Sequence, residues 1–167
     1  MKSLLFSLFA FCSLSACQNE TPDRIQREGK PDIELVFSDD AEMNAAIATA
    51  RKTLPRFDAA LNSGNPDQYG FALKVRFGAA DAGEHIWLSD IVIDSNQYYG
   101  VVNNDPEYIT EVAMGDTVRI DKTAISDWMF LEKGVLRGGS TIRYVRDHMT
   151  PAERATFDKE QGIIFED

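Results

Sequence analysis

The sequence predicts an α+β fold: one antiparallel sheet of about five strands packed against a long N-terminal helix, with a short C-terminal helix. Residues 39–61 repeat apolar side chains every three or four positions, which is typical of a helix with one buried face. Residues 71–132 instead alternate apolar and polar side chains between turn signals, as half-buried strands do. Helical and strand segments are thus grouped along the chain, which favours an α+β domain.

The start of the chain predicts export. Lys2 precedes an apolar run from Leu4 to Leu14, and small residues follow it. The run is shorter than the roughly 20 apolar residues that span a bilayer, so it is typical of a secretory signal peptide.

The last four residues of this segment, Leu14-Ser15-Ala16-Cys17, resemble the lipobox of bacterial lipoproteins. The resemblance implies cleavage before Cys17, acylation of that cysteine with fatty acids such as palmitate, and a membrane anchor. Gln18 resembles the residue that follows the cysteine in outer-membrane lipoproteins, so in a Gram-negative cell the protein would face the periplasm. Ordinary cleavage, which leaves Cys17 as a free thiol, is the alternative.

The segment that follows is polar, contains two prolines and a glycine, and has Ile25 as its one large aliphatic residue. Such a segment cannot bury enough apolar surface to order itself. We therefore expect a lipoprotein signal peptide at 1–16, a flexible tether at 17–31 and a single folded domain at 32–167.

The chain is acidic, with a formal net charge of −10 at pH 7. Removal of Lys2 with the signal peptide would leave 16 basic residues against 27 acidic ones, a charge of −11. This balance argues against nucleic acid as a partner and favours a basic protein or cell-wall partner. Solubility alone also explains it.

Cysteine and histidine are scarce, which limits the possible chemistry. Cys12 and Cys17 are the only cysteines, so no disulfide, thiolate nucleophile or cysteine-bound metal is expected after residue 17. The histidines, His85 and His148, lie 63 positions apart, which excludes the common zinc spacings. We expect no metal and no cofactor.

The long helix is predicted to begin at Asp39, whose side chain would form a reciprocal cap with that of Glu42. Pro55 predicts a kink or the start of a second helix, because it removes an amide. Ser63-Gly64-Asn65-Pro66 ends the helix. Its apolar face, a core-packing face, comprises Met43, Ala46, Ile47, Ala50, Leu54, Phe57 and Leu61.

A short strand is predicted at 33–37, before the helix, and five strands are predicted after it. Asp94-Ser95-Asn96 suits a hairpin connection between two of them. The predicted strands after the helix are Phe71–Phe77, His85–Ile93, Gln97–Asn103, Thr117–Ile120 and Asp127–Glu132.

Two segments complete the domain. Ser140–Met149 fits either a helix or a last strand. Thr150-Pro151-Ala152-Glu153 combines an N-cap hydroxyl, a proline at the first helical position and a glutamate three residues after the cap. A short helix from Pro151 to about Gln161 should follow.

Five short motifs lie in order within the region from Phe71 to Phe157, and together they resemble the YegJ-like family of bacterial proteins, a DUF2314-type domain of unknown function. The resemblance implies a single compact domain, often secreted or lipidated, and brings no catalytic residues with it. The motifs are Glu84-His85-Ile86-Trp87-Leu88, Gly100-Val101-Val102-Asn103-Asn104, Gly115-Asp116-Thr117-Val118, Ile125-Ser126-Asp127-Trp128 and Gly138-Gly139-Ser140-Thr141-Ile142-Arg143.

The candidate acid–base residues are Glu84, His85 and Asp127. His85 would act as a general base because its ordinary pKa lies near neutrality. On a strand, however, Glu84 and His85 point to opposite faces, which weakens a catalytic pair. A structural, hydrogen-bonded His85 is the alternative and the favoured interpretation.

The candidate binding residues are Trp87, Trp128, Arg143, Gly138 and Gly139. The two tryptophans would form aromatic walls of a ligand cleft, or belong to the core. Arg143 would line the cleft, or pair with Asp127 in a bidentate salt bridge. The amides after Gly138 and Gly139 would hold an anion, or the glycines would simply permit a tight turn.

Three functions follow from these residues. The favoured one is a non-catalytic envelope lipoprotein that binds a protein, a peptide or a wall component. A variant is an acidic inhibitor or immunity-type protein that masks a basic effector. The alternative is an envelope hydrolase that uses Glu84, His85 or Asp127 as acid or base.

Overall fold

A computed structural model describes residues 24–25, 33–34, 40–79 and 82–166. They belong to two units. In the first unit, β1 (Arg24–Ile25) pairs antiparallel with β2 (Ile33–Glu34), where the short first strand was predicted. The predicted signal peptide, Cys17 and the rest of the predicted tether lie outside the described residues.

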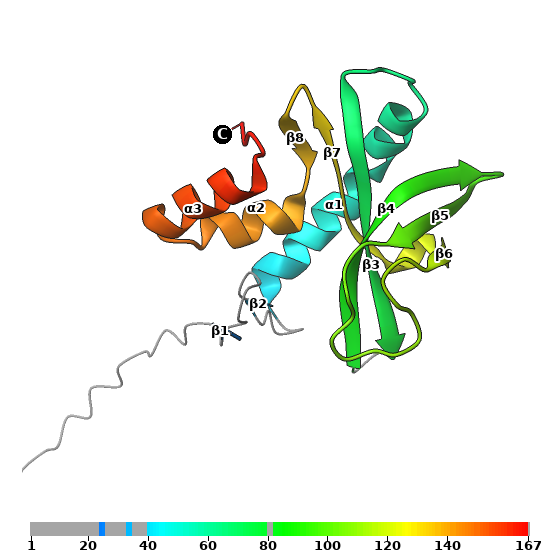
Figure 1. The fold of residues 1–167 in the computed structure, drawn as a ribbon, viewed down its shortest axis with the longest axis horizontal. Coiled ribbons are helices and arrows are strands. Elements are labelled where there is room, and N and C mark those ends of the chain that lie inside the picture. The colour runs from blue at the N-terminus through cyan, green and yellow to red at the C-terminus, as the bar shows by residue number, and fades with distance from the viewer. Residues whose placement is uncertain (1–23, 26–32, 35–39, 80–81, 167) are drawn as a thin grey trace, which may run out of the picture. The chain divides into compact units, whose positions relative to one another are not determined.

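The second unit is built on a six-stranded antiparallel sheet with the strand order β6-β5-β4-β3-β7-β8 (Figure 1). About five strands were expected. The additional strand is β8, whose sequence Val-Leu-Arg-Gly shows no alternation of apolar and polar residues. The strands are β3 (Gln68–Ala79), β4 (Ala82–Asp94), β5 (Gln97–Val102), β6 (Thr117–Ile120), β7 (Ile125–Glu132) and β8 (Val135–Gly138).

The second unit contains three α-helices, α1 (Ala41–Leu61), α2 (Ser140–Asp147) and α3 (Pro151–Gln161), and a 3-10 turn, η1 (Lys122–Ala124). α2 shows that the ambiguous segment after β8 is helical. None of the described helices has both the length and the apolarity needed to span a bilayer.

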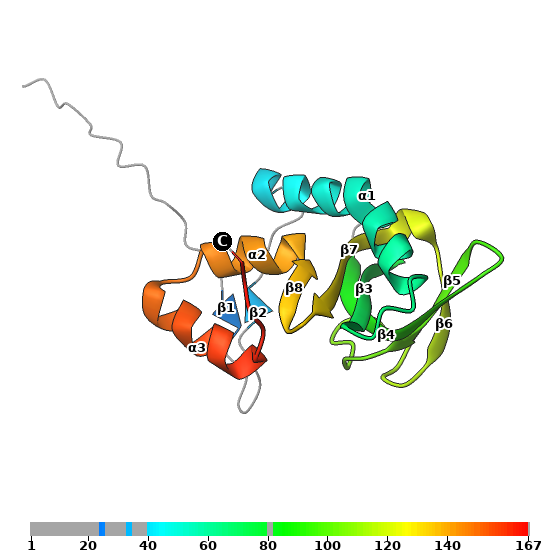
Figure 2. The same ribbon diagram turned by 90° about the horizontal axis from the view of Figure 1, so that it is seen from above.

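Each α-helix begins at a different kind of cap. The Asp40 carboxylate accepts the backbone N–H groups of Glu42 and Met43, so the cap of α1 lies one residue after the predicted cap, Asp39. The reciprocal cap predicted for α3 between Thr150 and Glu153 is present. α1 continues through Pro55, and Figure 2 shows its axis bending in the second half, as the missing amide predicts.

α1 runs diagonally across one face of the sheet, which we call the inner face (Figures 1 and 2). Its side chains at Ala50, Leu54 and Phe57 belong there to one buried cluster with apolar residues of strands β3 to β7. Phe57 lies edge-on to Phe71, with 5.7 Å between ring centroids. The buried core on the sheet side includes Leu73, Val75, Ile86, Leu88, Tyr98, Val102, Ile120, Ile125, Trp128 and Phe130.

The opposite face, which we call the outer face, carries the polar residues of the central strands. Lys74 of β3 lies opposite Trp87 of β4 on one side and opposite Asp127 of β7 on the other. Because side chains alternate between faces, His85 of β4 belongs to the same face. Three of the predicted site residues, His85, Trp87 and Asp127, are thus brought together with a lysine.

Candidate functional site

Asp127 is fully buried and holds the start of α2 in place. One carboxylate oxygen, Oδ1, accepts the backbone N–H groups of Trp128 at 2.8 Å and Ser140 at 3.1 Å. The other oxygen, Oδ2, accepts both the backbone N–H and the hydroxyl of Thr141, each at 2.7 Å. Burial raises the pKa of Asp127, and the hydrogen bonds from Thr141 and Trp128 act in the opposite direction.

This arrangement corrects one prediction and explains another. The expected salt bridge between Asp127 and Arg143 is wrong. Arg143 lies one turn into α2 and donates backwards to the backbone carbonyls of Leu136 and Gly138, and also to that of Glu166. The amides at the start of α2 do hold an anion, but that anion is the protein's own Asp127.

Gly138 and Gly139 make the tight turn that aims these amides. Both glycines have left-handed backbone angles, with φ of 74° and 64°. At Gly138, an added Cβ would lie 2.3 Å from the Trp128 carbonyl oxygen, so β7 and the turn approach each other too closely for any side chain. The glycine pair therefore acts as a turn rather than as a ligand loop.

The two tryptophans do not line one cleft, contrary to the ligand-cleft prediction. Trp128 is buried on the inner face, where its Nε1 donates to the carbonyl of Ala50 at 2.9 Å. Trp87 lies half-buried on the outer face. The register explains the difference, because Trp128 lies opposite Leu73 whereas Trp87 lies opposite the next residue, Lys74.

Glu84 points away from His85, as the strand alternation predicted. Its carboxylate accepts the backbone N–H groups of Glu107 and Tyr108, at 3.0–3.1 Å. Asn104 makes a second connection between β4 and this segment, because its side-chain oxygen accepts the Trp87 N–H at 3.0 Å. Glu84 therefore anchors the loop between β5 and β6 and forms no pair with His85.

His85 instead contacts Ser126, with 2.8 Å between Nδ1 and Oγ. Ser126 is the extra residue of a β-bulge, because the register passes from Lys74 opposite Asp127 to Val75 opposite Ile125. Its hydroxyl also lies 3.2 Å from the Lys74 carbonyl. One hydroxyl proton cannot serve both acceptors, so we assign a proton to His85 Nδ1, which donates to the Ser126 hydroxyl oxygen, while the Ser126 hydroxyl donates to the backbone carbonyl of Lys74.

With that assignment His85 does not draw a proton from Ser126, and Ser126 is itself fully buried. Burial, followed by the positive charges of Lys74, Arg76 and Arg51, lowers the pKa of His85 to about 4. His85 is thus a neutral, structural histidine near pH 7, which agrees with the favoured interpretation of the sequence.

The lowered pKa of His85 predicts acid sensitivity. Between pH 6.5 and about 4 the unfolded chain takes up a proton at this residue that the folded chain does not, so stability is lost as the pH falls through this window. Allowing for its partial exposure, we expect a loss of about 2 kcal/mol. Denaturant unfolding at pH 7 and pH 4 measures it, with His85→Asn as the comparison because asparagine keeps an N–H donor for Ser126. An equal loss in both proteins would contradict the prediction.

Lys74 is a site residue that the sequence does not single out, because a polar residue of a half-buried strand is expected to point to solvent. Its Nζ lies 3.5 Å from the Thr141 hydroxyl oxygen and 5.7 Å from the centroid of the Trp87 ring. Burial lowers its pKa, and the charge of Asp127 opposes this. One signal in the sequence could have indicated its burial: Lys74 lies in the middle of a long strand, and such a strand is typically central in a sheet, with a neighbour on each side.

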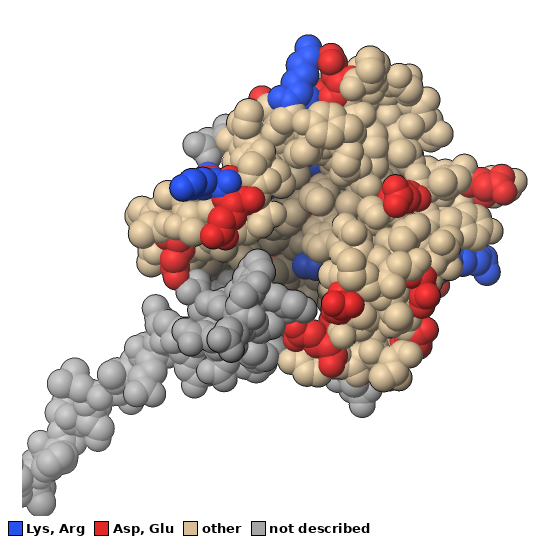
Figure 3. Space-filling view, in the orientation of Figure 1, with Lys and Arg blue, Asp and Glu red and all other residues tan. Residues whose placement is uncertain are grey.

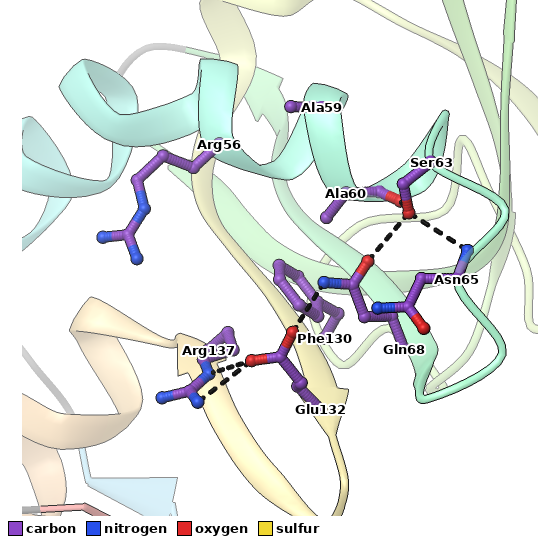
Figure 4. A pocket seen from close by; sticks show the side chains of 9 residues that line it. All are labelled: Arg56, Ala59, Ala60, Ser63, Asn65, Gln68, Phe130, Glu132 and Arg137. Atoms are coloured by element: carbon purple, nitrogen blue, oxygen red, sulfur yellow. Dashed lines mark hydrogen bonds and ion pairs between the residues drawn. The ribbon is translucent and has the colours of Figure 1, made fainter.

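A separate cavity of about 420 Å³ lies between the end of α1 and strands β7 and β8 (Figure 4). Glu132 occupies one wall, where it accepts hydrogen bonds from Gln68 at 2.8 Å and from Arg137 at 3.0 Å. Arg56 enters from the α1 side, and no dashed line joins it to another residue drawn there (Figure 4). The lining residues are Arg56, Ala59, Ala60, Ser63, Asn65, Gln68, Phe130, Glu132 and Arg137.

Neither region is built like a metal or acid–base centre. Within the described ranges, no three His, Cys, Asp or Glu side chains lie close enough together to hold a metal ion. In the cavity, Glu132 has a pKa lowered first by its hydrogen bond from Gln68 and then by that from Arg137, so it is an ionised, paired group. Glu132 therefore contributes hydrogen bonding and charge pairing to the cavity.

Comparison with known proteins places these residues in a bacterial family. Residues 40–165 match the family model DUF2314, described as an uncharacterized protein conserved in bacteria. Uncharacterized protein YegJ of Escherichia coli is 32% identical over 142 residues, which cover 85% of this chain and 86% of YegJ.

A second relative is a putative ankyrin repeat protein of Neisseria meningitidis, 44% identical over 84 residues, half of this chain. The match spans about a third of the length of that protein, 33%. No solved structure matches the chain significantly.

Proposed function

The chain belongs to the DUF2314 family of conserved bacterial proteins, and from this premise we propose that it is a non-catalytic binding module of the cell envelope, tethered by an acylated Cys17. One observation carries the proposal of a non-catalytic role. The three candidate acid–base groups, Glu84, His85 and Asp127, are all engaged in internal contacts.

A catalytic acid or base must reach the substrate, and these groups are poorly placed to do so. The oxygens of Asp127 accept four hydrogen bonds inside the protein. Glu84 and His85 lie on opposite faces of β4 and share no partner. What the sheet offers to a partner is a polar, aromatic surface, which suits recognition better than acid–base chemistry.

The envelope location rests on the lipobox Leu14-Ser15-Ala16-Cys17. Several acyl chains on Cys17 would anchor the protein stably, so the folded unit needs no basic patch for membrane adhesion. In a Gram-negative cell we propose the periplasmic face of the outer membrane. The acidic charge, −10, favours a partner with a basic surface, either a protein or a wall component.

One experiment tests both parts of the proposal. Cells that express the full-length protein are labelled with radioactive palmitate, and the detergent-solubilised protein is purified from their membranes. The wild type is expected to carry the label and to sediment with membranes, whereas Cys17→Ala carries none. An unlabelled wild type would overturn the anchor.

The same purified protein is then incubated with envelope extract, and the bound and free components are compared by mass spectrometry over time. A binding module retains a component that remains chemically intact, and His85→Asn retains it equally well. Product that accumulates with wild type and falls at least about 100-fold with His85→Asn would establish a hydrolase instead.

A further inference from the structure

We propose that Lys74 and the ring of Trp87 form a binding site for one carboxylate group of a partner molecule, on the outer face of the sheet. The proposal deepens the binding function above and rests on it. The carboxylate would come from an acidic side chain or a peptide C-terminus.

The Lys74 ammonium has an incomplete set of hydrogen-bond partners. An ammonium group has three N–H donors, and the Thr141 hydroxyl oxygen at 3.5 Å can accept one of them, at a long distance. That oxygen is already committed as a donor to Asp127. Within the described part of the chain, no ion pair is formed by Lys74.

This arrangement is energetically unfavourable for the charged form of Lys74. A cation that leaves water loses hydration, which the long hydrogen bond to Thr141 and the charge of Asp127 replace only in part. The lowered pKa of Lys74, caused by burial, reflects the same cost. Groups held in such an unfavourable state are typical of functional sites, because a ligand of opposite charge removes the penalty when it binds.

The charge around Lys74 and His85 differs in sign from the net charge of the whole chain. His85 is influenced by three cations, Lys74, Arg76 and Arg51, in a protein with a net charge of −10. Viewed from the side opposite α1, the surface is hollowed between α2 and the β3–β4 pair, and basic side-chain atoms are visible in the hollow (Figure 3). These three cations outnumber the Asp127 carboxylate that lies opposite Lys74, and an excess of positive charge in a recess attracts anions.

Among the oxyanions, a carboxylate fits this site best. A phosphate dianion is typically held by several donors, often including the free amides of a helix N-terminus. The nearby amides of Ser140 and Thr141 are already occupied by Asp127. The Lys74 ammonium is then the donor available to a ligand, and its single positive charge matches a single carboxylate. The Trp87 ring supplies an apolar wall for the carbon atoms next to that carboxylate.

The site can be tested by NMR with acetate as the probe, because the chain contains two tryptophans on opposite faces. Trp87→Phe assigns their two indole N–H signals in the full-length protein. At constant ionic strength, acetate should shift the Trp87 signal saturably and leave Trp128 unmoved, since the Trp128 Nε1 is bonded to Ala50 inside the core. Acetamide, an uncharged analogue, should shift neither signal.

Lys74→Met should weaken the acetate response at least tenfold, whereas the matched control Lys159→Met, on the exposed face of α3, should not change it. The thermal midpoint of Lys74→Met should equal or exceed that of the wild type, because relief of the desolvated ammonium outweighs the loss of its attraction to Asp127. A lower midpoint would identify a structural lysine. If Lys74→Met does not fold, Lys74→Gln takes its place.

Three results would overturn the proposal: no acetate response, a response that survives in the Lys74 variant, or an equal response to acetamide. Inorganic phosphate is titrated in parallel, and a response to phosphate alone would overturn the carboxylate assignment. Turnover in the envelope-extract experiment would overturn the non-catalytic function but leave the acetate titration unchanged, so the two failures are distinguishable.

Discussion

Replacing Asp127 by alanine is expected to lower the free energy of unfolding by about 3 kcal/mol. The substitution removes the acceptor for the backbone N–H groups of Ser140 and Thr141 and for the Thr141 hydroxyl. Thr141 is buried, so its donors lose a partner where water replaces it poorly. Denaturant unfolding followed by circular dichroism measures the change.

Two controls separate the buried cap from an ordinary one. Asp127→Asn keeps the size and one acceptor oxygen, so it should lose less stability than Asp127→Ala. Asp121 caps η1 through the Thr123 N–H in an exposed position, and Asp121→Ala should cost the least of the three. Equal losses for the two alanine variants would show that burial of the Asp127 cap adds nothing.

Replacing Gly138 by alanine is expected to cost about 3–4 kcal/mol. Part of the cost is the left-handed backbone, with φ of 74°, and the larger part is the overlap of the new Cβ with the Trp128 carbonyl oxygen 2.3 Å away. Neither the carbonyl nor the Trp128 ring can move without disturbing β7 and the core. Thermal and denaturant unfolding both report the loss.

Gly64 provides the matched control for Gly138. It has a similar φ of 63°, but an added Cβ there would meet nothing within 4 Å. Gly64→Ala should therefore show the backbone cost alone, about 1 kcal/mol. If both variants lose the same free energy of unfolding, the close approach of the turn to Trp128 does not explain why position 138 needs glycine.

The sequence predicts the elements that depend on local patterns. α1 and α3 are recognisable because helical spacing and the Thr150–Glu153 cap involve residues a few positions apart. The sequence of β8, Val-Leu-Arg-Gly, has no alternation of apolar and polar residues, so it does not predict the pairing with β7. The helical state of α2 depends on a cap supplied by Asp127, 13 residues before Ser140, so local reasoning left it open.

The candidate site shows the same division. The alternation of β4 correctly separated Glu84 from His85, because it needs only the strand period. The pairing of Arg143 with Asp127 failed because it required the direction of α2 relative to β7. Lys74 was missed because its burial comes from Trp87 and Asp127 on neighbouring strands, which no pattern within β3 encodes.

The attachment of the loop between β5 and β6 has an evolutionary consequence. Glu84 holds this loop by the backbone amides of Glu107 and Tyr108, which every residue except proline provides. The Tyr108 side chain is 68% exposed. Substitutions at positions 107 and 108 other than to proline can thus change the displayed side chains and leave this attachment to β4 in place.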